Sequence, residues 1–333
     1  MNPRVIHFLV TLAAVPGCSA GLQVHSPLNS TPLEERVPAQ YKKEVAFVQD
    51  VRRFAIEHLG MEQDSKHYTW FTEKQDNGHT LYILSITEKT ILPTSRIAKV
   101  EELDKLSAYR ADIKEFLYLE SEVDTLEDER DYYNKKGYDT NWRSVTDYHT
   151  YGGKEGSPIT LDFLKSTPEY QAKVVVHELC HGFVEKNIKA GFASSLDESF
   201  CSMVGYAGAA EYFTYKNLPE EHTKAVKAFD HYHTFAEKFV VSFEKLQRLY
   251  HEGLSQDEML KRRAALFAEA EEFMGGEVNN ALMWSWHPYL FNYPLMHTVY
   301  TVQGDSVPKI MQKMRHCPEN EEKALKYIQE LAK

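Results

Sequence analysis

The sequence contains a short pattern whose residue types and spacing suit metal chemistry, His177-Glu178-Leu179-Cys180-His181. Side chains four residues apart lie on one face of a helix, so the two imidazoles can bind one zinc ion at about 2.0–2.1 Å from each nitrogen. Glu178 is expected to face the water that completes the zinc coordination. A carboxylate there can accept a proton from that water and pass it to a leaving amine, as peptide hydrolysis requires.

A catalytic zinc site normally has three protein ligands and one open position, so a third ligand must come from elsewhere in the chain. Glu198 follows His181 by 17 residues, a gap that allows the end of one helix, a loop and the start of a second helix. This arrangement resembles that of the gluzincins, the thermolysin-like group, in which a Glu on the next helix is the third ligand. We therefore expect His177, His181 and Glu198 to bind one zinc ion.

Other roles for these side chains remain open from the sequence. Ser195 and Glu198 also form a capping-box pattern, in which the Glu bonds only the backbone at the start of a helix. Glu185, one turn after His181, could compete as the third ligand, although a solvated helix end suits it better. A metzincin site is excluded, because that motif needs Gly and His where this chain has Val184 and Asn187.

Three further groups of residues invite functional interpretations that we do not adopt. His233 and Glu237 are four residues apart, but such pairs more often lie on a solvated helix surface. Cys180 and Cys201 lie on the two proposed helices, where a disulfide is possible but unsupported. A set of aromatic residues is expected to belong mainly to the core, with a smaller chance of lining the substrate cleft: Trp284, Trp286, Tyr289 and Tyr293.

Helices and strands that would position the motif follow from the pattern of the rest of the chain. Thr167 is placed to cap a helix with Pro168 at its first position, running to about Glu185, and a second helix should begin near Ser195. The charged stretch 97–135 has helical spacing in places. Further segments follow from their periodicity: helices over 41–59, 221–252, 256–273 and 319–332, and strands over 67–72, 80–87 and 141–151. Because the strands come early and most helices late, we predict an α+β fold.

The composition is that of an ordinary globular protein. The chain has 333 residues, of which 43% are hydrophobic and 26% charged, with a formal net charge of −11. An excess of negative charge argues against nucleic acid as the main partner. Four cysteines are too few for a disulfide-built scaffold.

The N-terminus has the pattern of an export signal. Arg4 precedes an apolar stretch, residues 5–15, which is too short to span a bilayer, and Cys18 follows a small residue. We predict a signal peptide over 1–17, a lipid-modified Cys18, and a flexible tether over 18–40. Residues 41–333 would then form a peptidase domain with a mixed α/β part, 41–165, and a helical part carrying the zinc site, 166–333. The chain would lie on the periplasmic side of a bacterial membrane, with Ser19 weakly favouring the outer membrane.

Most of this body resembles a bacterial family of predicted aminopeptidases, gluzincin-type zinc peptidases that are often lipoproteins. The resemblance lies in segments that match the family's motifs: Val51-Arg52-Arg53-Phe54-Ala55 with Leu59-Gly60, Gly137-Tyr138-Asp139, Asp147-Tyr148-His149-Thr150, the zinc motif, Asp197-Glu198-Ser199-Phe200, Leu249-Tyr250 with Arg262, and Asn279-Asn280-Ala281 with Tyr289 and Pro294. The chain departs from the family at Asp197, where Asn is usual, and around Gly152, where a Trp-Phe pair is missing. These departures mark a divergent member.

The resemblance implies a zincin-like α+β fold, a peptide or protein substrate and an aminopeptidase activity. Peptide hydrolysis also needs a donor for the developing oxyanion. Tyr289, by its place in the family block, is the first candidate for this catalytic role, and Tyr148 is the second. Two alternatives remain: a zinc endopeptidase, and a non-catalytic lipoprotein binding module with a vestigial motif.

Overall fold

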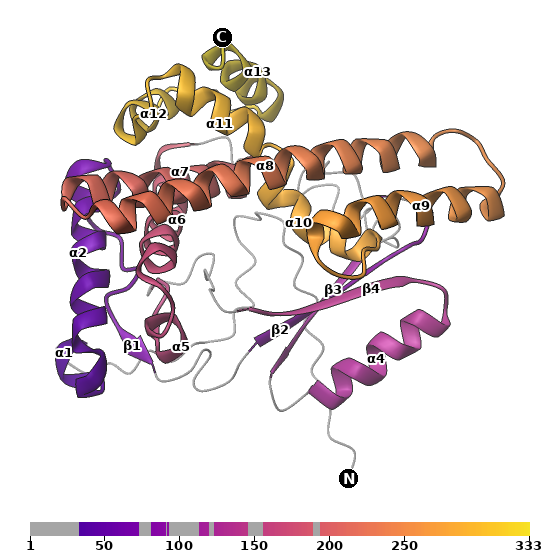
Figure 1. Ribbon diagram of the computed structural model, residues 1–333, viewed down its shortest axis with the longest axis horizontal. Helices are drawn as coiled ribbons and strands as arrows, with labels where there is room; N and C mark the ends of the chain where they lie inside the picture. Colours follow the sequence, from indigo (N-terminus) through magenta and orange to yellow (C-terminus); the bar gives the residue numbers. More distant parts are fainter. Residues whose placement is uncertain are drawn as a thin grey trace.

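Figure 1 shows the computed structural model of the chain, which describes residues 33–72, 81–90, 92, 113–119, 123–145, 156–188 and 194–333. It has the predicted α+β character, with small sheets in the N-terminal half and helices after them. Along the chain the elements are α1 (Leu33–Arg36), η1 (Ala39–Tyr41), α2 (Lys42–His58), β1 (Phe71–Thr72), β2 (Leu81–Thr87), β3 (Ile113–Leu119), α4 (Val123–Lys135), β4 (Asp139–Val145), β5 (Ile159–Thr160), α5 (Leu161–Leu164), α6 (Pro168–Asn187), α7 (Ser194–Tyr215), α8 (Pro219–Tyr250), α9 (Gln256–Met274), α10 (Asn280–Leu290), α11 (Tyr293–Val302), α12 (Val307–Met314) and α13 (Glu321–Leu331).

Helix α6 carries the two histidines, and its start is fixed as the sequence predicts. The Thr167 side chain accepts a 3.3 Å hydrogen bond from the backbone N–H of Tyr170, and Pro168 occupies the first helical position. Residues 174–181 are all buried, so this helix is enclosed on every side rather than on one apolar face. The motif therefore lies inside the protein, not on its surface.

Helix α7 packs against α6 through positions that have no side chain. A Cβ added to Gly205 would lie 2.8 Å from the carbonyl oxygen of Lys173 and 3.0 Å from the Cβ of His177. A Cβ added to Gly208 would lie 2.8 Å from Cγ1 of Val176. Because only glycine leaves this space open, the two helices can approach closely enough for the beginning of α7 to meet the histidines of α6.

An antiparallel sheet of order β3-β2-β4 lies between two helices. One face packs on α4, where Leu84, Ile86 and Leu126 form a small core of their own. The other face packs on α10: the backbone N–H of Asn280 donates a 3.0 Å hydrogen bond to Asp139 of β4. Among the described strands, β4 is an edge strand, pairing only with β2. Strands β1 and β5 form a separate parallel pair of two residues each.

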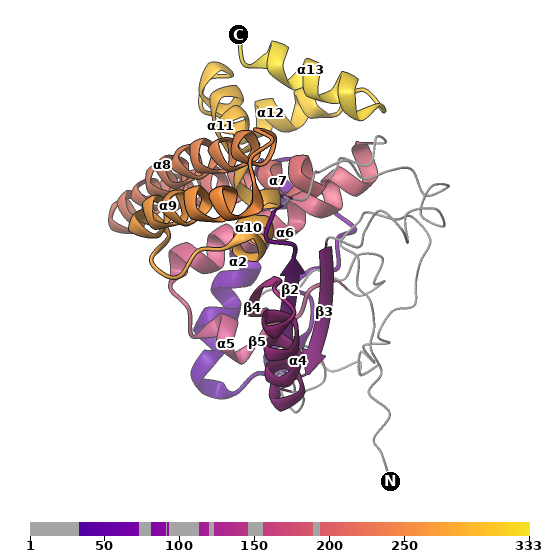
Figure 2. The same ribbon diagram turned by 90° about the vertical axis from the view of Figure 1, so that its right-hand side faces the viewer.

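The remaining helices build one large core around α6 and α7. Helix α2 packs against α6 with its buried face and ends at His58, and Gly60, at φ +87°, follows in the left-handed conformation that glycine adopts most readily. The antiparallel pair α8 and α9 covers α7 and α10, and helices α11–α13 lie on the side of the molecule opposite to α4 (Figures 1 and 2). None of the helices in the described ranges has both the length and the apolar character that a membrane span requires.

Helix boundaries agree with the sequence predictions to within a few residues, whereas the strands differ more. Strand structure predicted over 67–72 is limited to β1, because residues 67–70 form a turn with Tyr68 at φ +59°. The charged stretch 97–135 contains strand β3 as well as helix α4, because backbone pairing with β2 decides its conformation. The strand predicted over 141–151 begins earlier, as β4; residues 146–151, the predicted signal, Cys18 and residues 19–32 of the predicted tether lie outside the described residues. The rest of the predicted tether, residues 33–40, contains α1 and the start of η1, and Val37 between them is buried in the core.

Candidate metal centre

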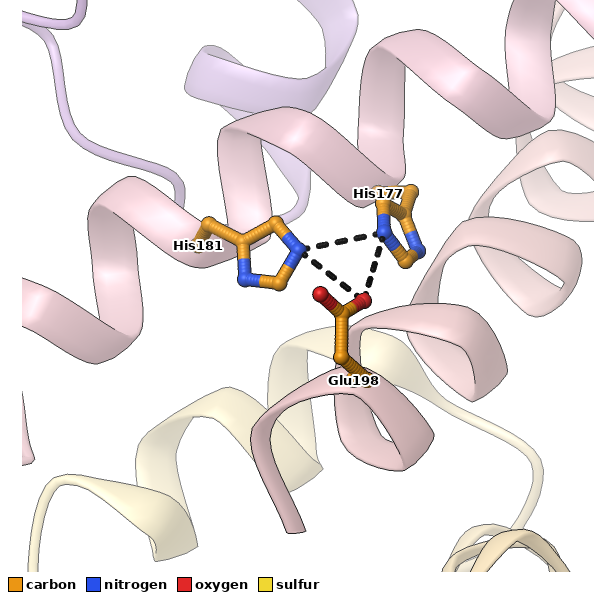
Figure 3. A group of neighbouring side chains, drawn as sticks. All are labelled: His177, His181 and Glu198. Atoms are coloured by element: carbon orange, nitrogen blue, oxygen red, sulfur yellow. Dashed lines mark hydrogen bonds and ion pairs between the residues drawn. The ribbon is translucent and has the colours of Figure 1, made fainter. Parts of the chain in front are cut away.

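Two histidines from α6 and one glutamate from α7 meet inside the protein (Figure 3). The Nε2 atoms of His177 and His181 lie 3.1 Å apart. The Oε2 atom of Glu198 lies 3.4 Å from each of these nitrogens. Both histidines are buried, and the Glu198 side chain is 18% exposed. The carboxylate of Glu198 thus faces the imidazoles.

The spacing of these three atoms fits a metal ion. Donor atoms that surround one zinc ion tetrahedrally at about 2.0–2.1 Å lie roughly 3.3–3.4 Å from one another. The Oε2 atom of Glu198 and the Nδ1 atom of His177 are buried and have no well-aligned hydrogen bond to any described residue. An imidazole pair and a carboxylate are a usual donor set for zinc. The group could therefore bind a metal ion.

The electrostatics of the three side chains differ because their surroundings differ. Burial lowers the pKa of His177, which favours the neutral imidazole that a metal requires. Burial acts to raise the pKa of Glu198, but the charge of His181 and the hydrogen bonds of both histidines outweigh it and hold that pKa well below its usual range. For His181, burial acts to lower the pKa, but the carboxylates of Asp197 and Glu198 raise it well above its ordinary value.

Asp197 contacts the Nδ1 atom of His181, on the side of the ring away from the Nε2 atom that faces His177 and Glu198. Its Oδ1 atom lies 3.0 Å from the Nδ1 atom of His181. A carboxylate can only accept, so Nδ1 must carry a proton, and Nε2 is the ring atom left to bind a metal ion. The thiol of Cys201 donates to the same oxygen of Asp197 at 3.4 Å. Cys180 and Cys201 are both free thiols, not a disulfide.

The two residues expected to act on the substrate lie near this group. Glu178 is buried beside His177 on α6, and its charge acts on His177 and on Tyr289. Tyr289 comes from the last turn of α10; the charge of Glu198 first, and burial second, raise the pKa of its hydroxyl. The hydroxyl forms no hydrogen bond within the described part of the chain. Tyr148, the second candidate for the oxyanion donor, lies outside the described residues.

Helix α10 holds Tyr289 in place through its other end. Asn279 caps the helix by accepting a 3.0 Å hydrogen bond from the backbone N–H of Leu282, and its amide donates a 2.9 Å hydrogen bond to the carbonyl of Thr140 on β4. The cap therefore fixes both the start of α10 and its position on the sheet.

Two residues near the centre were not assigned by sequence reasoning. Asp197 stood out only as a departure from the family pattern, although a carboxylate next to a ligand is a plausible partner for a metal-bound histidine. Arg143 lies on β4, and its positive charge partly opposes the effect by which Glu198 and burial raise the pKa of Tyr289. The alternation of β4 would have placed Arg143 on the same face as Asn141, but the position of that face relative to the motif could not be known from the sequence.

The other groups considered from the sequence do not gather around a metal position. His233 lies 3.7 Å from Glu237 on the surface of α8, and its ring stacks on His297. Within the described residues, the groups of three metal-ligating side chains both contain His181, the second being His181, Asp197 and Cys201. Of the aromatic set, Tyr293 is fully buried and Trp286 is 36% exposed.

The fold and the site define a helical protein with a buried centre of the His-Glu-x-x-His type. Comparison with protein families agrees with this class: the model of a family described as "Putative aminopeptidase" matches residues 122–326. That match spans more than half of the chain and includes every residue of the centre, so the chain belongs to this family, whose name implies a peptidase and a peptide substrate. No curated protein and no solved structure matches the chain.

Proposed function

We propose that this protein is a zinc-dependent peptidase, most simply an aminopeptidase, with one zinc ion bound by His177, His181 and Glu198. The observation that carries the proposal is the meeting of three donor atoms at 3.1–3.4 Å from one another, in a buried place with an acidic residue beside it. The proposal extends the family's activity to this chain and commits to the metal.

Each residue of the centre has a part in this proposal. Bound zinc would polarise the scissile carbonyl and acidify a water molecule. Glu178 accepts the proton of the attacking water and then delivers it to the leaving amine. Tyr289 donates its hydroxyl proton in a hydrogen bond to the carbonyl oxygen as negative charge develops there. Asp197 keeps His181 in the tautomer and orientation that the site needs. No covalent intermediate forms on the protein.

The proposal is tested with Glu178→Gln and a matched control on the same helix, Glu185→Gln, where the native side chain is exposed. Peptide cleavage is measured with the full chain on a peptide library, and bound zinc by mass spectrometry. We expect the Glu178→Gln protein to lose all cleavage and still bind about one zinc per chain. The Glu185→Gln control should bind the same amount of zinc and keep full activity. Full activity of the Glu178→Gln protein would refute the mechanism.

A second variant tests the metal ligands. Glu198→Ala should lose zinc or bind it far more weakly than the wild-type chain, because a third ligand is gone. If folded wild-type protein takes up no zinc when zinc is supplied, the motif is vestigial and a non-catalytic binding module becomes the better description. Substrates with blocked N-termini separate the two peptidase activities: an aminopeptidase stops at the block, whereas an endopeptidase does not.

We also propose that the protein is a lipoprotein of the bacterial cell envelope, attached through Cys18 and facing the periplasm. The support is the apolar stretch of residues 5–15, with Arg4 before it and Cys18 after it. Cys18→Ser should abolish the incorporation of a labelled fatty acid that the wild-type protein shows in expressing bacteria. A wild-type protein without the label, or equal labelling of the two proteins, would overturn the lipid anchor.

A further inference from the structure

Strand β4 presents alternate side chains to α10. Asp139 binds the start of α10 through the backbone N–H of Asn280, and Asn141 donates a 3.5 Å hydrogen bond to the hydroxyl of Ser285, one and a half turns later. Successive residues of a strand point to opposite faces, so Arg143 shares the face of Asp139 and Asn141. It is the next residue in this series, and Figure 1 shows β4 passing beneath α10.

The next turn of α10 after Ser285 contains Tyr289. This places Arg143 beside the tyrosine that lies next to the metal centre, and the positive charge of Arg143 acts on the Tyr289 hydroxyl in opposition to the charge of Glu198. The side chain of Arg143 is half-buried. Arg143 thus stands at the border between the sheet and the centre.

The guanidinium of Arg143 is not committed to another group in the described structure. Asp139, which lies on the same face of β4, has such a partner, because its carboxylate forms a buried ion pair with Arg263 of α9 at 3.0 Å. Arg143, in contrast, forms no ion pair and no side-chain hydrogen bond within the described ranges. A half-buried guanidinium needs anionic or carbonyl partners for its five donors, so a ligand bound at the centre is expected to supply them.

We propose that Arg143 anchors a carboxylate of the peptide substrate, which makes peptides with a carboxylate near the scissile bond the preferred substrate class. This inference rests on the proposed peptidase function. A guanidinium matches a carboxylate with two parallel hydrogen bonds, and such charge-assisted bonds are about twice as strong as those to a neutral carbonyl. The same charge repels a free amino terminus, so Arg143 does not recognise the amine of an aminopeptidase substrate. The carboxylate has two sources, the C-terminus of a short peptide or an acidic side chain.

The experiment compares Arg143→Met and Arg143→Lys with the wild-type full chain and a control, Arg130→Met, which removes another half-buried arginine, on α4. One tetrapeptide library is made with free C-termini and again with C-terminal amides. A second pair of amidated libraries contains either Glu or Gln at a common position. Mixed libraries are digested together, and the relative consumption read by mass spectrometry gives the ratio of kcat/KM values.

We expect the wild-type and the Arg130→Met proteins to prefer one carboxylate library over its neutral partner by about tenfold to a hundredfold. The library that shows the preference identifies the source of the carboxylate. Arg143→Met should bring that ratio to within about threefold of unity, and Arg143→Lys should keep part of it, because the charge remains without the fork. Thermal unfolding of each variant shows whether it has folded.

Two results would overturn the proposal: equal consumption of both members of each pair by the wild-type protein, or an undiminished preference in folded Arg143→Met. An equal loss on acidic and neutral peptides would mean that Arg143 binds only a backbone carbonyl. Equilibrium dialysis of the same libraries against zinc-loaded Glu178→Gln measures binding without turnover. Failure of the wild-type protein to cleave any peptide would refute the peptidase function, while the acid-to-neutral ratio in dialysis would still decide the role of Arg143.

Discussion

The contact between α6 and α7 offers a quantitative test, because one missing side chain sets the distance between the proposed metal ligands. In Gly205→Ala the new Cβ would lie 2.8 Å from the carbonyl oxygen of Lys173 and 3.0 Å from the Cβ of His177. The carbonyl belongs to the backbone of a buried helix and cannot rotate away, so the helices must separate by about half an ångström to restore van der Waals contact.

The expected cost is that of overpacking a core, about 1–3 kcal/mol. For a protein of this size that lowers the unfolding temperature by roughly 1.5–4 °C. The same movement shifts His177 away from Glu198, whose Oε2 atom is 3.4 Å from its Nε2. We therefore expect zinc affinity to fall by about tenfold or more, as it does when the support of a ligand is disturbed.

The matched control is Gly182→Ala, one residue after His181 on α6. Nothing lies within 4 Å of a Cβ at that position, so alanine should stabilise the helix by about 0.5–1 kcal/mol and leave zinc affinity unchanged. Thermal unfolding of the metal-free and zinc-loaded full chains gives the stabilities, and competition with a chelator gives the zinc affinities. If Gly205→Ala matches the wild-type chain in both measurements, close approach of α6 and α7 does not set the geometry of the centre.

Three further predictions concern other buried groups. Asp197→Ala should weaken zinc binding by about tenfold to a hundredfold, and Asp197→Asn by less because its amide oxygen still accepts from His181; chelator competition that shows no change would contradict this. Arg263→Met should destabilise the protein by about 3–5 kcal/mol in denaturant unfolding, since Asp139 would be left buried and unpaired; a loss below about 1 kcal/mol would refute the reasoning. Burial lowers the pKa of His287 to about 4, so below about pH 6.5 the unfolded chain takes up a proton at this residue that the folded chain does not. The free energy of unfolding should therefore fall as the pH drops from about 6.5 to 4, by up to about 3 kcal/mol. His287→Phe should flatten that part of the stability–pH curve, and an unchanged slope would argue against it.

Local sequence rules predicted the helical part of the fold well. Thr167 and Pro168 mark the start of α6, and the structure shows the predicted capping hydrogen bond. The strands were predicted less well, because a strand depends on its partner. Strand β3 lies in a charged stretch with helical spacing in places, and only its pairing with β2 determines its structure.

The candidate centre was likewise predictable from the sequence only in its local part. The spacing of His177 and His181 was sufficient to predict that they share one helix face, because helix geometry is local. The capping-box pattern of Ser195 and Glu198 was an equally local alternative, and no rule of spacing could exclude it. In the structure the Glu198 carboxylate lies against the two imidazoles, a placement that depends on how closely α7 approaches α6.

The sequence by itself determined the elements whose causes lie within a few residues: the α6 cap, the pair of histidines one turn apart, and the ends of the long helices. Only the tertiary structure decided which carboxylates reach those histidines and which side chains surround them. Asp197 meets His181, and Arg143 lies beside Tyr289, because separate helices and a strand pack together. The physical reason is that helix formation depends on local hydrogen bonds and caps, whereas contacts between distant elements depend on the packing of the whole core.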